Sequence, residues 1–412
     1  MAADYTKRTT NQEASDLGKY FADQFNAADG NSPRATPRAI GALLSESEAS
    51  KRAKPLPAAC DEWAAAERAQ QERAVFWLQE RQSDSWHELM PIKKMNELAK
   101  SAEARGDREK ARILHAVRCL MLNEESLRPS ARPPGEIGTA EQVFALESSF
   151  PNFADVIQDI GVQADLFHAA RAGGERAFLR LPPLLLWGEP GTGKTSFLEA
   201  LSRVLGVPLF MQPCHSSLPA HTFSGLAAGY ASANPGRVFE VAAASPIATP
   251  LFVLDEIDKL DQSGEDSPLG ALLALFEPTT AKSFFDDFLL MPFDASRMLL
   301  ATTANDPERI PAPLRSRLTP YKIGLPTEAQ MRQIAREIYR EMLRERGLSR
   351  VFDAEPGPGF VETVAAGSVR ELKSIVERAL LSARYAGRRA PIALDAKAAI
   401  AARIRNAPRI DD

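Results

Sequence analysis

The chain has 412 residues, of which 44% are hydrophobic and 25% charged, and its formal net charge is −4. This composition excludes a fully disordered, collagen-like or disulfide-scaffold chain and is typical of a globular protein with a few folded units. The three cysteines (Cys60, Cys119 and Cys214) form no CxxC pair and no cluster with histidine, so neither a zinc site nor a disulfide framework is expected. The sequence has no run of about 18 apolar residues and no apolar signal segment at its N-terminus, so we expect a cytoplasmic protein without membrane contact.

The N-terminal third of the chain divides into three parts by composition. Residues 1–59 are rich in Ala, Ser, Asn and Pro with little apolar periodicity, which predicts a disordered or partner-binding tail. Residues 60–122 repeat apolar side chains at helical spacing, and we expect a helical domain in which Gly106 ends one helix in the left-handed conformation. Residues 123–137 are rich in proline and are interpreted as a linker and domain boundary.

The pattern changes at about residue 138. Strand-length apolar runs then alternate with helical stretches, which predicts an α/β fold with a parallel sheet over residues 138–325. The predicted strands are residues 181–187, 207–211, 250–254 and 298–303. Beyond them, Thr327 and Gln330 form a capping box that opens a helix. We expect residues 326–412 to form a smaller helical subdomain.

The eight residues that directly follow the first predicted strand fit the phosphate-binding pattern G-x-x-x-x-G-K-[ST]. They are Gly188, Glu189, Pro190, Gly191, Thr192, Gly193, Lys194 and Thr195, and Ser196 continues into the predicted helix that follows. A strand before the motif and a helix after it are the context that this motif requires. Its backbone N–H groups and the helix N-terminus would bind the phosphates of ATP. Lys194 would bridge the β- and γ-phosphates, and the Thr195 hydroxyl would bind Mg²⁺.

Two further predicted strands end in polar side chains. Asp255 and Glu256 follow residues 250–254, and we expect Asp255 to hold Mg²⁺ through its water shell and Glu256 to polarise the attacking water. Asn305 follows residues 298–303, where its amide would orient that water or touch the γ-phosphate. The structural alternatives are an ordinary strand end at Asp255 and a simple turn at Asn305.

This order of motifs resembles that of the AAA+ ATPases and, within them, most resembles the ATPase module of Lon. The resemblance covers about residues 145–405. It is carried by residues 186–195, 230–237, 250–259, 284–294 and 310–317. It implies an AAA+ P-loop sheet with a helical lid subdomain, and the hydrolysis of ATP with Mg²⁺.

The resemblance also implies a role for individual side chains. Asn305 matches the sensor-1 residue, and Arg370 fits the sensor-2 position at the start of a lid helix. Arg317 matches the arginine finger that reaches the ATP of the next subunit, with Arg315 as a nearby alternative. Tyr230 matches the pore-loop aromatic, which can grip an extended polypeptide without sequence preference. A solvated surface charge is the alternative for each arginine, and a side chain packed on the domain surface is the alternative for Tyr230.

We therefore expect a homo-oligomeric ring, a hexamer, that remodels or unfolds a protein client. The chain ends at Asp412 without a Ser/Lys motif, so we do not expect it to carry the protease activity that follows the lid in Lon. Two alternatives share the same chemistry. One is a nucleotide-switched assembly factor on nucleic acid, either clamp-loader-like or a transposition regulator, and the other is a MoxR-like maturation chaperone. The acidic net charge and the lack of a recognisable DNA-binding motif make nucleic acid the second choice.

Overall fold

The computed structural model describes residues 87–90, 97, 100–106, 131–175, 177–216, 218–227, 234–260, 267–365 and 369–406. The predicted tail and most of the predicted helical domain lie outside these ranges. Within that domain, residues 100–104 are helical, and Gly106 follows them with a φ of 74°. This is the left-handed conformation expected of a glycine that ends a helix.

Five parallel strands form the central sheet, in the order β4–β5–β8–β3–β9. Their bounds are Leu184–Trp187 (β3), Leu209–Pro213 (β4), Leu251–Asp255 (β5), Leu299–Ala304 (β8) and Thr319–Lys322 (β9). Four of them correspond to the predicted apolar runs, so the expected parallel α/β architecture is confirmed. The fifth, β9, escaped prediction because it is an edge strand that contains a proline and alternates between half-buried and exposed residues.

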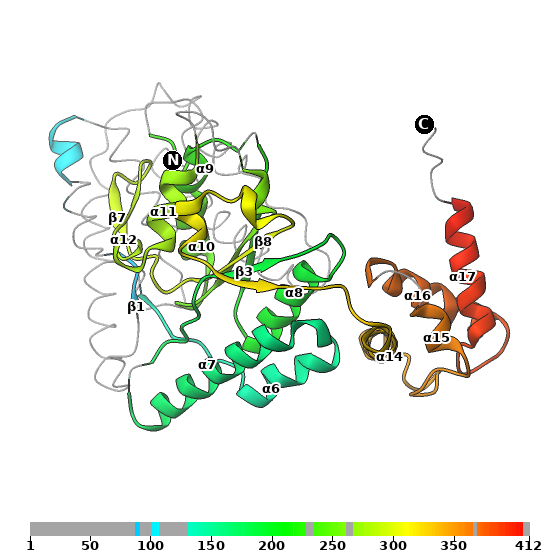
Figure 1. Cartoon of the computed structure of the whole chain (residues 1–412). Coiled ribbons are helices and arrows are strands. Elements are labelled where there is room, and N and C mark those ends of the chain that lie inside the picture. The colour runs from blue at the N-terminus through cyan, green and yellow to red at the C-terminus, as the bar shows by residue number, and fades with distance from the viewer. Residues whose placement is uncertain are drawn as a thin grey trace, which may run out of the picture.

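Helices cover both faces of this sheet (Figure 1). One face carries α6 (Ala140–Phe144), α7 (Ala154–Ala172) and α8 (Lys194–Leu205). The opposite face carries α9 (His221–Ser224), α10 (Arg237–Ala244) and α11 (Leu269–Phe276). The result is a three-layer sandwich in which the carboxyl ends of all five strands meet at one edge.

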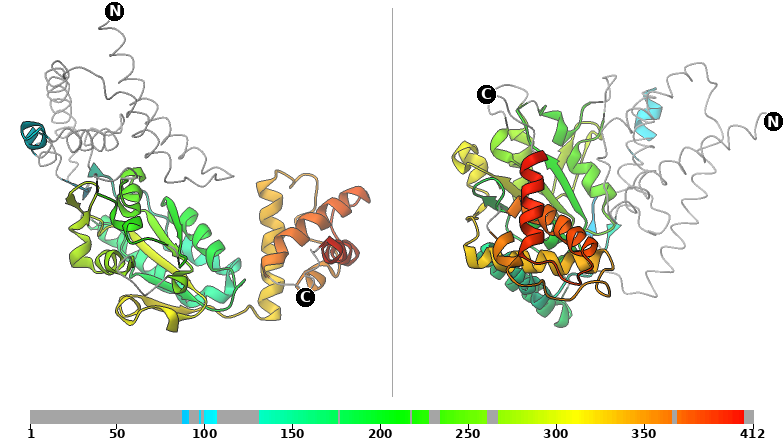
Figure 2. Two further views of the ribbon diagram at one scale, coloured as in Figure 1. Left: turned by 90° about the horizontal axis from the view of Figure 1, so that it is seen from above. Right: turned by 90° about the vertical axis from the view of Figure 1, so that its right-hand side faces the viewer.

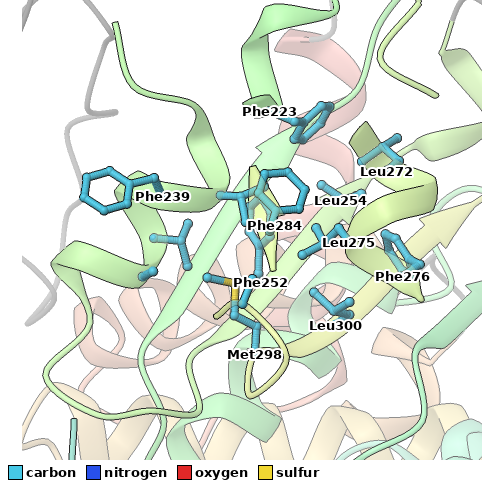
Figure 3. Close-up of a cluster of buried hydrophobic side chains, with 14 of the residues drawn as sticks. Phe223, Phe239, Phe252, Leu254, Leu272, Leu275, Phe276, Phe284, Met298 and Leu300 are labelled. Carbon is cyan, nitrogen blue, oxygen red and sulfur yellow. The ribbon is translucent and has the colours of Figure 1, made fainter. Parts of the chain in front are cut away.

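The strands are apolar throughout because both of their faces are buried. On β5, Leu251 and Val253 pack into the core beneath α6, α7 and α8, whereas Phe252 and Leu254 pack into the core on the opposite side. Figure 3 shows this second core, where Phe252 and Leu254 lie beside Phe284. Successive side chains of a strand point to opposite faces, so one continuous apolar run supplies two cores.

A short antiparallel hairpin precedes β8. It consists of β6 (Phe284–Asp286) and β7 (Met291–Phe293), and it follows the short helix α12 (Pro278–Ala281). The rings of Phe284 and Phe293 meet edge to face with their centroids 5.6 Å apart. The hairpin thereby contributes to the second core, although no strand was predicted here from sequence.

Residues of the predicted proline-rich linker pack against the α/β body. β2 (Ala131–Arg132) pairs with β1 (His87–Glu88). The Arg132 guanidinium is buried and donates from Nε to Ser245 O (2.7 Å) and from Nη2 to Ala243 O (3.0 Å). These carbonyls lie at the C-terminus of α10, where a positive charge is favourable. Arg132 therefore attaches this N-terminal segment to α10.

The C-terminal subdomain forms a separate helical unit, drawn in orange and red in Figures 1 and 2. It contains α14 (Glu328–Glu345), α15 (Phe360–Val364), α16 (Val369–Tyr385) and α17 (Ala393–Asn406), which share their own apolar core. The capping box of Thr327 and Gln330 is present at the start of α14, as predicted. None of the described helices is long and apolar enough to cross a membrane.

Two glutamines on α14 join this subdomain to the sheet body. Gln330 Nε2 donates to Pro151 O at 3.1 Å, and Gln333 Nε2 donates to Ser148 O at 3.0 Å. Their acceptors belong to η2 (Ala145–Ser148) and η3 (Pro151–Phe153), two 3₁₀ turns that precede α7. These contacts are polar, made by side-chain amides on backbone carbonyls, and ion pairs from Arg203 of α8 to Glu341 and Glu345 of α14 add to them.

Candidate functional site

The phosphate-binding motif forms a tight loop between β3 and α8. Gly191 and Gly193 have φ values of 83° and 96°, which are unfavourable for residues with a side chain. A Cβ atom on Gly188 would lie 2.1 Å from the carbonyl oxygen of Ile323, so only glycine fits at the start of the loop. The Thr192 hydroxyl donates to Glu189 O at 3.1 Å and holds the loop in shape. This geometry brings the first turn of α8 to the carboxyl edge of the sheet, where its free N–H groups can bind an anion.

The remaining loop residues lie at its rim. Glu189 and Pro190 are exposed at the start of the loop, and Ser196 is exposed in the first turn of α8.

The buried side chain of Lys194 lies within the loop, and its ammonium group is fully hydrogen-bonded. Nζ donates to Gly188 O at 2.7 Å, to Glu189 O at 3.0 Å and to Asn305 Oδ1 at 3.3 Å. An ammonium group has only three hydrogens to donate, so a bound phosphate would have to replace one of these three acceptors.

The charge of Lys194 is set by two opposed effects. Burial lowers the pKa of its ammonium group below the ordinary value. The nearby carboxylates of Asp258, Asp255 and Glu256 act in the opposite direction and raise it. Lys194 is thus a partly desolvated cation facing a group of acidic side chains, which is a suitable environment for a phosphate chain accompanied by a divalent metal.

Asp255 lies at the end of β5, next to both Thr195 and Thr303. Its Oδ1 atom is 3.5 Å from the Thr195 hydroxyl and accepts a hydrogen bond of 2.6 Å from the Thr303 hydroxyl. A hydroxyl and a carboxylate are hard oxygen ligands of the kind that Mg²⁺ prefers. Adjacent ligands of an octahedral Mg²⁺ lie about 3 Å apart, so the separation of Thr195 and Asp255 fits such an ion or its water shell.

Glu256 follows Asp255 in an unusual backbone conformation. Its φ and ψ are 57° and 47°, the left-handed region, which costs about 1–2 kcal/mol for a residue with a side chain. Its N–H donates to the Thr303 hydroxyl at 2.9 Å. Its carboxylate forms an ion pair of 2.6 Å with Lys259, and both side chains are about half exposed. Glu256, the residue expected to polarise water, therefore lies next to Asp255 at the site, and its carboxylate is ion-paired with Lys259.

Asn305 is held in place by Asp258. The backbone N–H groups of Asn305 and Asp306 both donate to Asp258 Oδ2 at 3.1 Å, and Asp258 is only 6% exposed. The side-chain amide of Asn305 is thereby free to accept from Lys194. The structure thus brings Lys194 and Thr195, at the start of α8, close to Asp255 and Asn305, which lie at the carboxyl ends of β5 and β8.

Arg315 and Arg317 make different contacts. Arg315 Nη1 lies 2.6 Å from Glu308 Oε2, and Arg317 Nε lies 3.4 Å from Glu277 Oε2. Both arginines lie on or next to the short helix α13 (Ala312–Arg315). Among the contacts described for this chain, neither guanidinium meets Lys194, Asp255 or Asn305. A residue that acts on the ATP of a neighbouring subunit would show this arrangement, and so would an ordinary surface ion pair.

Two of the predicted site residues cannot be placed by their side chains. Tyr230 lies outside the described residues. Arg370 lies in the first turn of α16, within the lid, and only its backbone is described. The roles given to both remain predictions.

Three residues of the site were missed from sequence. Thr303 and Asp258 contact the motif residues through a hydroxyl and a carboxylate, as described above. Asn152 donates from Nδ2 to Thr192 O (3.2 Å) in the phosphate loop and to Gly324 O (3.1 Å) in the segment leading to the lid. Thr303 and Asp258 each lie two residues from a predicted site residue, Asn305 and Glu256, which was a usable signal in the sequence. No such signal marks Asn152.

Comparisons with known proteins find similarity in the region of the chain that contains this site. Residues 184–323 match the family model described as "ATPase family associated with various cellular activities (AAA)". The chain is 36% identical over 184 residues to Lon protease 1 of Sorangium cellulosum and 36% identical over 168 residues to Lon protease 2 of Thermus thermophilus. These alignments cover 44% and 40% of this chain but only 23% and 21% of the two relatives.

Among solved structures, the chain is similar to the Thermotoga maritima RuvB Holliday junction branch migration motor. The sequence identity is 15%, the TM-score is 0.37, and the match covers 66% of this chain and 72% of that one. In contrast to this structural match, the alignments with the Lon proteases span less than a quarter of the length of those proteins, and the similarity to them lies in the ATPase region.

Proposed function

Because the chain contains an AAA ATPase domain related to the ATPase module of Lon proteases, we propose that it binds and hydrolyses ATP as a homo-oligomeric ring that remodels or unfolds a protein client. The observation that carries the ATP-binding part of the proposal is the hydrogen bond from Lys194 to Asn305, because it joins the phosphate loop to the end of another strand.

Each group at the edge of the sheet has a task in this reaction. The loop N–H groups and Lys194 would bind the phosphates, and Thr195 and Asp255 would hold a magnesium ion, which would supply positive charge to the phosphate chain. Glu256 orients and polarises the attacking water, and Asn305 holds the γ-phosphate or that water in line. The ion pair of Glu256 with Lys259 is half exposed and screened by solvent, so the carboxylate can leave it at little cost.

The ring completes the site. Arg317 would reach the γ-phosphate bound to the next subunit, with Arg315 as the alternative, and Arg370 would approach it from the lid. A guanidinium at this point stabilises the charge that spreads over the phosphoryl oxygens in the transition state. Support for this step comes from the family, whose members commonly form oligomeric rings, and from the absence of contacts between these arginines and their own chain's described site.

The client is proposed to be an extended polypeptide gripped by Tyr230. The proposal rests on the similarity to the Lon ATPase module, in which an aromatic occupies the matching loop position. Since the matched segment lies in the ATPase region of the Lon proteins, proteolysis is not part of the proposed function. A nucleic-acid partner and a single protein matured in a MoxR-like manner are the other outcomes of the test below.

The first experiment measures ATP binding and hydrolysis separately. Glu256→Gln should keep ATP affinity while kcat falls about 10²–10⁴-fold, because the group that polarises water is removed and the phosphate contacts are not. Lys194→Ala should instead weaken ATP binding itself. Equal losses of affinity in both variants would contradict the roles assigned to these residues.

The second experiment identifies the class of client. ATP hydrolysis is measured alone, with a permanently unfolded protein, and with single-stranded or duplex DNA, for the wild type and for Tyr230→Ala. Stimulation by the unfolded protein that is lost in Tyr230→Ala supports the remodelling motor. Stimulation by DNA alone, with a steep salt dependence and an unaltered response in Tyr230→Ala, would replace it with a nucleic-acid assembly factor.

A further inference from the structure

One buried hydroxyl lies between the two acidic residues that end β5. Thr303, on β8, donates from Oγ1 to Asp255 Oδ1 at 2.6 Å and accepts from the N–H of Glu256 at 2.9 Å. The side chain is only 2% exposed, so water does not compete for either bond. A hydroxyl has one hydrogen to donate, and here that hydrogen goes to the carboxylate.

The two hydrogen bonds act on different properties of the site. The bond to Oδ1 fixes the orientation of the Asp255 carboxylate relative to Thr195, which shares the same oxygen at 3.5 Å. The bond from the Glu256 N–H fixes the peptide group between Asp255 and Glu256, and it thereby supports the left-handed backbone of Glu256, whose φ is 57°. Backbone conformations of this kind persist only where the surroundings hold them in place, and they concentrate at functional sites.

We propose that Thr303 is a positioning residue for ATP hydrolysis, whose hydroxyl sets the directions of both the Asp255 carboxylate and the Glu256 backbone. The inference rests on the proposed function, since it gives Thr303 its role through Asp255 and Glu256. The hydrogen bonds described for the Thr303 hydroxyl go to Asp255 and Glu256, and none goes to the phosphate loop. Its loss would leave the phosphate loop and Lys194 intact but would misplace the metal-holding carboxylate and the water-polarising residue together.

The neighbouring threonine offers a matched control. Thr302 is equally buried and donates from Oγ1 to Leu184 O at 3.0 Å, a bond that joins β8 to β3. Successive residues of a strand point to opposite faces, so the two hydroxyls serve different sides of the same strand. Replacing either threonine with valine removes one buried hydroxyl and keeps the size of the side chain. Only Thr303→Val also removes contacts with Asp255 and Glu256.

The test compares the full-length wild type, Thr303→Val, Thr303→Ser and Thr302→Val. For each protein, the measurements are kcat, the ATP dissociation constant, the Mg²⁺ concentration for half-maximal hydrolysis and the urea midpoint of unfolding. Thr303→Val should lower kcat about 10–100-fold, because it leaves the Glu256 N–H without its acceptor and Asp255 Oδ1 with only the long contact to Thr195, and it should raise the Mg²⁺ requirement. ATP affinity should change less than about threefold, since none of the Lys194 contacts is altered.

The other two variants separate positioning from stability. Thr303→Ser should return kcat to within about threefold of the wild type, because it restores the hydroxyl. Thr302→Val should keep the wild-type kcat and Mg²⁺ requirement, even if its urea midpoint falls as far as that of Thr303→Val. If Thr303→Val hydrolyses ATP as fast as the wild type, or if Thr302→Val loses as much kcat, the positioning role is overturned.

Failure of the inference can be told apart from failure of the proposed function. A wild-type protein that does not hydrolyse ATP faster than Glu256→Gln overturns the proposed function and the role of Thr303 with it. A wild-type protein that hydrolyses ATP, together with an undiminished Thr303→Val, overturns the role of Thr303 alone.

Discussion

The carboxyl edge of the sheet and the turn around α13 both carry charged residues that the sequence marks as functional, but their contacts differ. At the edge of the sheet, Lys194 is hydrogen-bonded to Asn305, and Asp255 contacts the hydroxyls of Thr195 and Thr303, all within one chain. At α13, Arg315 and Arg317 instead meet Glu308 and Glu277. Under the proposed function, one chain would position the groups that bind ATP, whereas the α13 arginines would act on the ATP of another chain.

The strongest test of this comparison removes one arginine at a time. Arg317→Ala should lower kcat about 10³–10⁵-fold, the range for an arginine finger in NTPases, while Arg315→Ala should have a clearly smaller effect. Mixing Arg317→Ala with Lys194→Ala chains should recover activity, because some interfaces then combine an intact nucleotide site with an intact arginine. The measurement is the rate of hydrolysis against protein concentration. A rate per chain that does not depend on concentration would contradict the comparison.

The next test asks whether the edge of the sheet works as one connected unit. Asp258→Ala removes the acceptor of two backbone N–H groups at Asn305 and Asp306, so kcat should fall about 10–100-fold as the Asn305 amide loses its position. Asp258→Asn keeps one accepting oxygen and should retain more activity. In a double-mutant cycle, Asp258→Ala should add little to Asn305→Ala. Fully additive losses would mean that Asp258 acts independently of Asn305.

The smallest expected effect concerns the partner of Arg317. Arg317 and Glu277 are 31% and 39% exposed, and such a pair contributes about 0–1 kcal/mol. Glu277→Gln should therefore change kcat by less than about fivefold. A loss as large as that of Arg317→Ala would show that the ion pair within the chain, and not contact with a second subunit, is what Arg317 is needed for.

Much of the candidate site was predictable because its residues follow a fixed local pattern. The phosphate loop needs glycine where φ is positive, as at Gly191 and Gly193, or where another backbone approaches closely, as Ile323 does at Gly188. The helix start at Thr327 was visible because a capping box is a contact between residues three apart. The edge strand β9 and the hairpin of β6 and β7 were not predicted, because short strands with proline or aspartate carry little apolar signal.

The amino-acid sequence by itself determined which residues end the strands and which residues form the phosphate loop, because these depend on neighbours within a few positions along the chain. Only the tertiary structure decided which strands lie side by side. The order β4–β5–β8–β3–β9 places β8 between β5 and β3, so that Thr303 reaches Asp255 and Asn305 reaches Lys194. Strand order depends on how two cores close over both faces of the sheet, which involves residues more than a hundred positions apart and leaves no local pattern in the sequence.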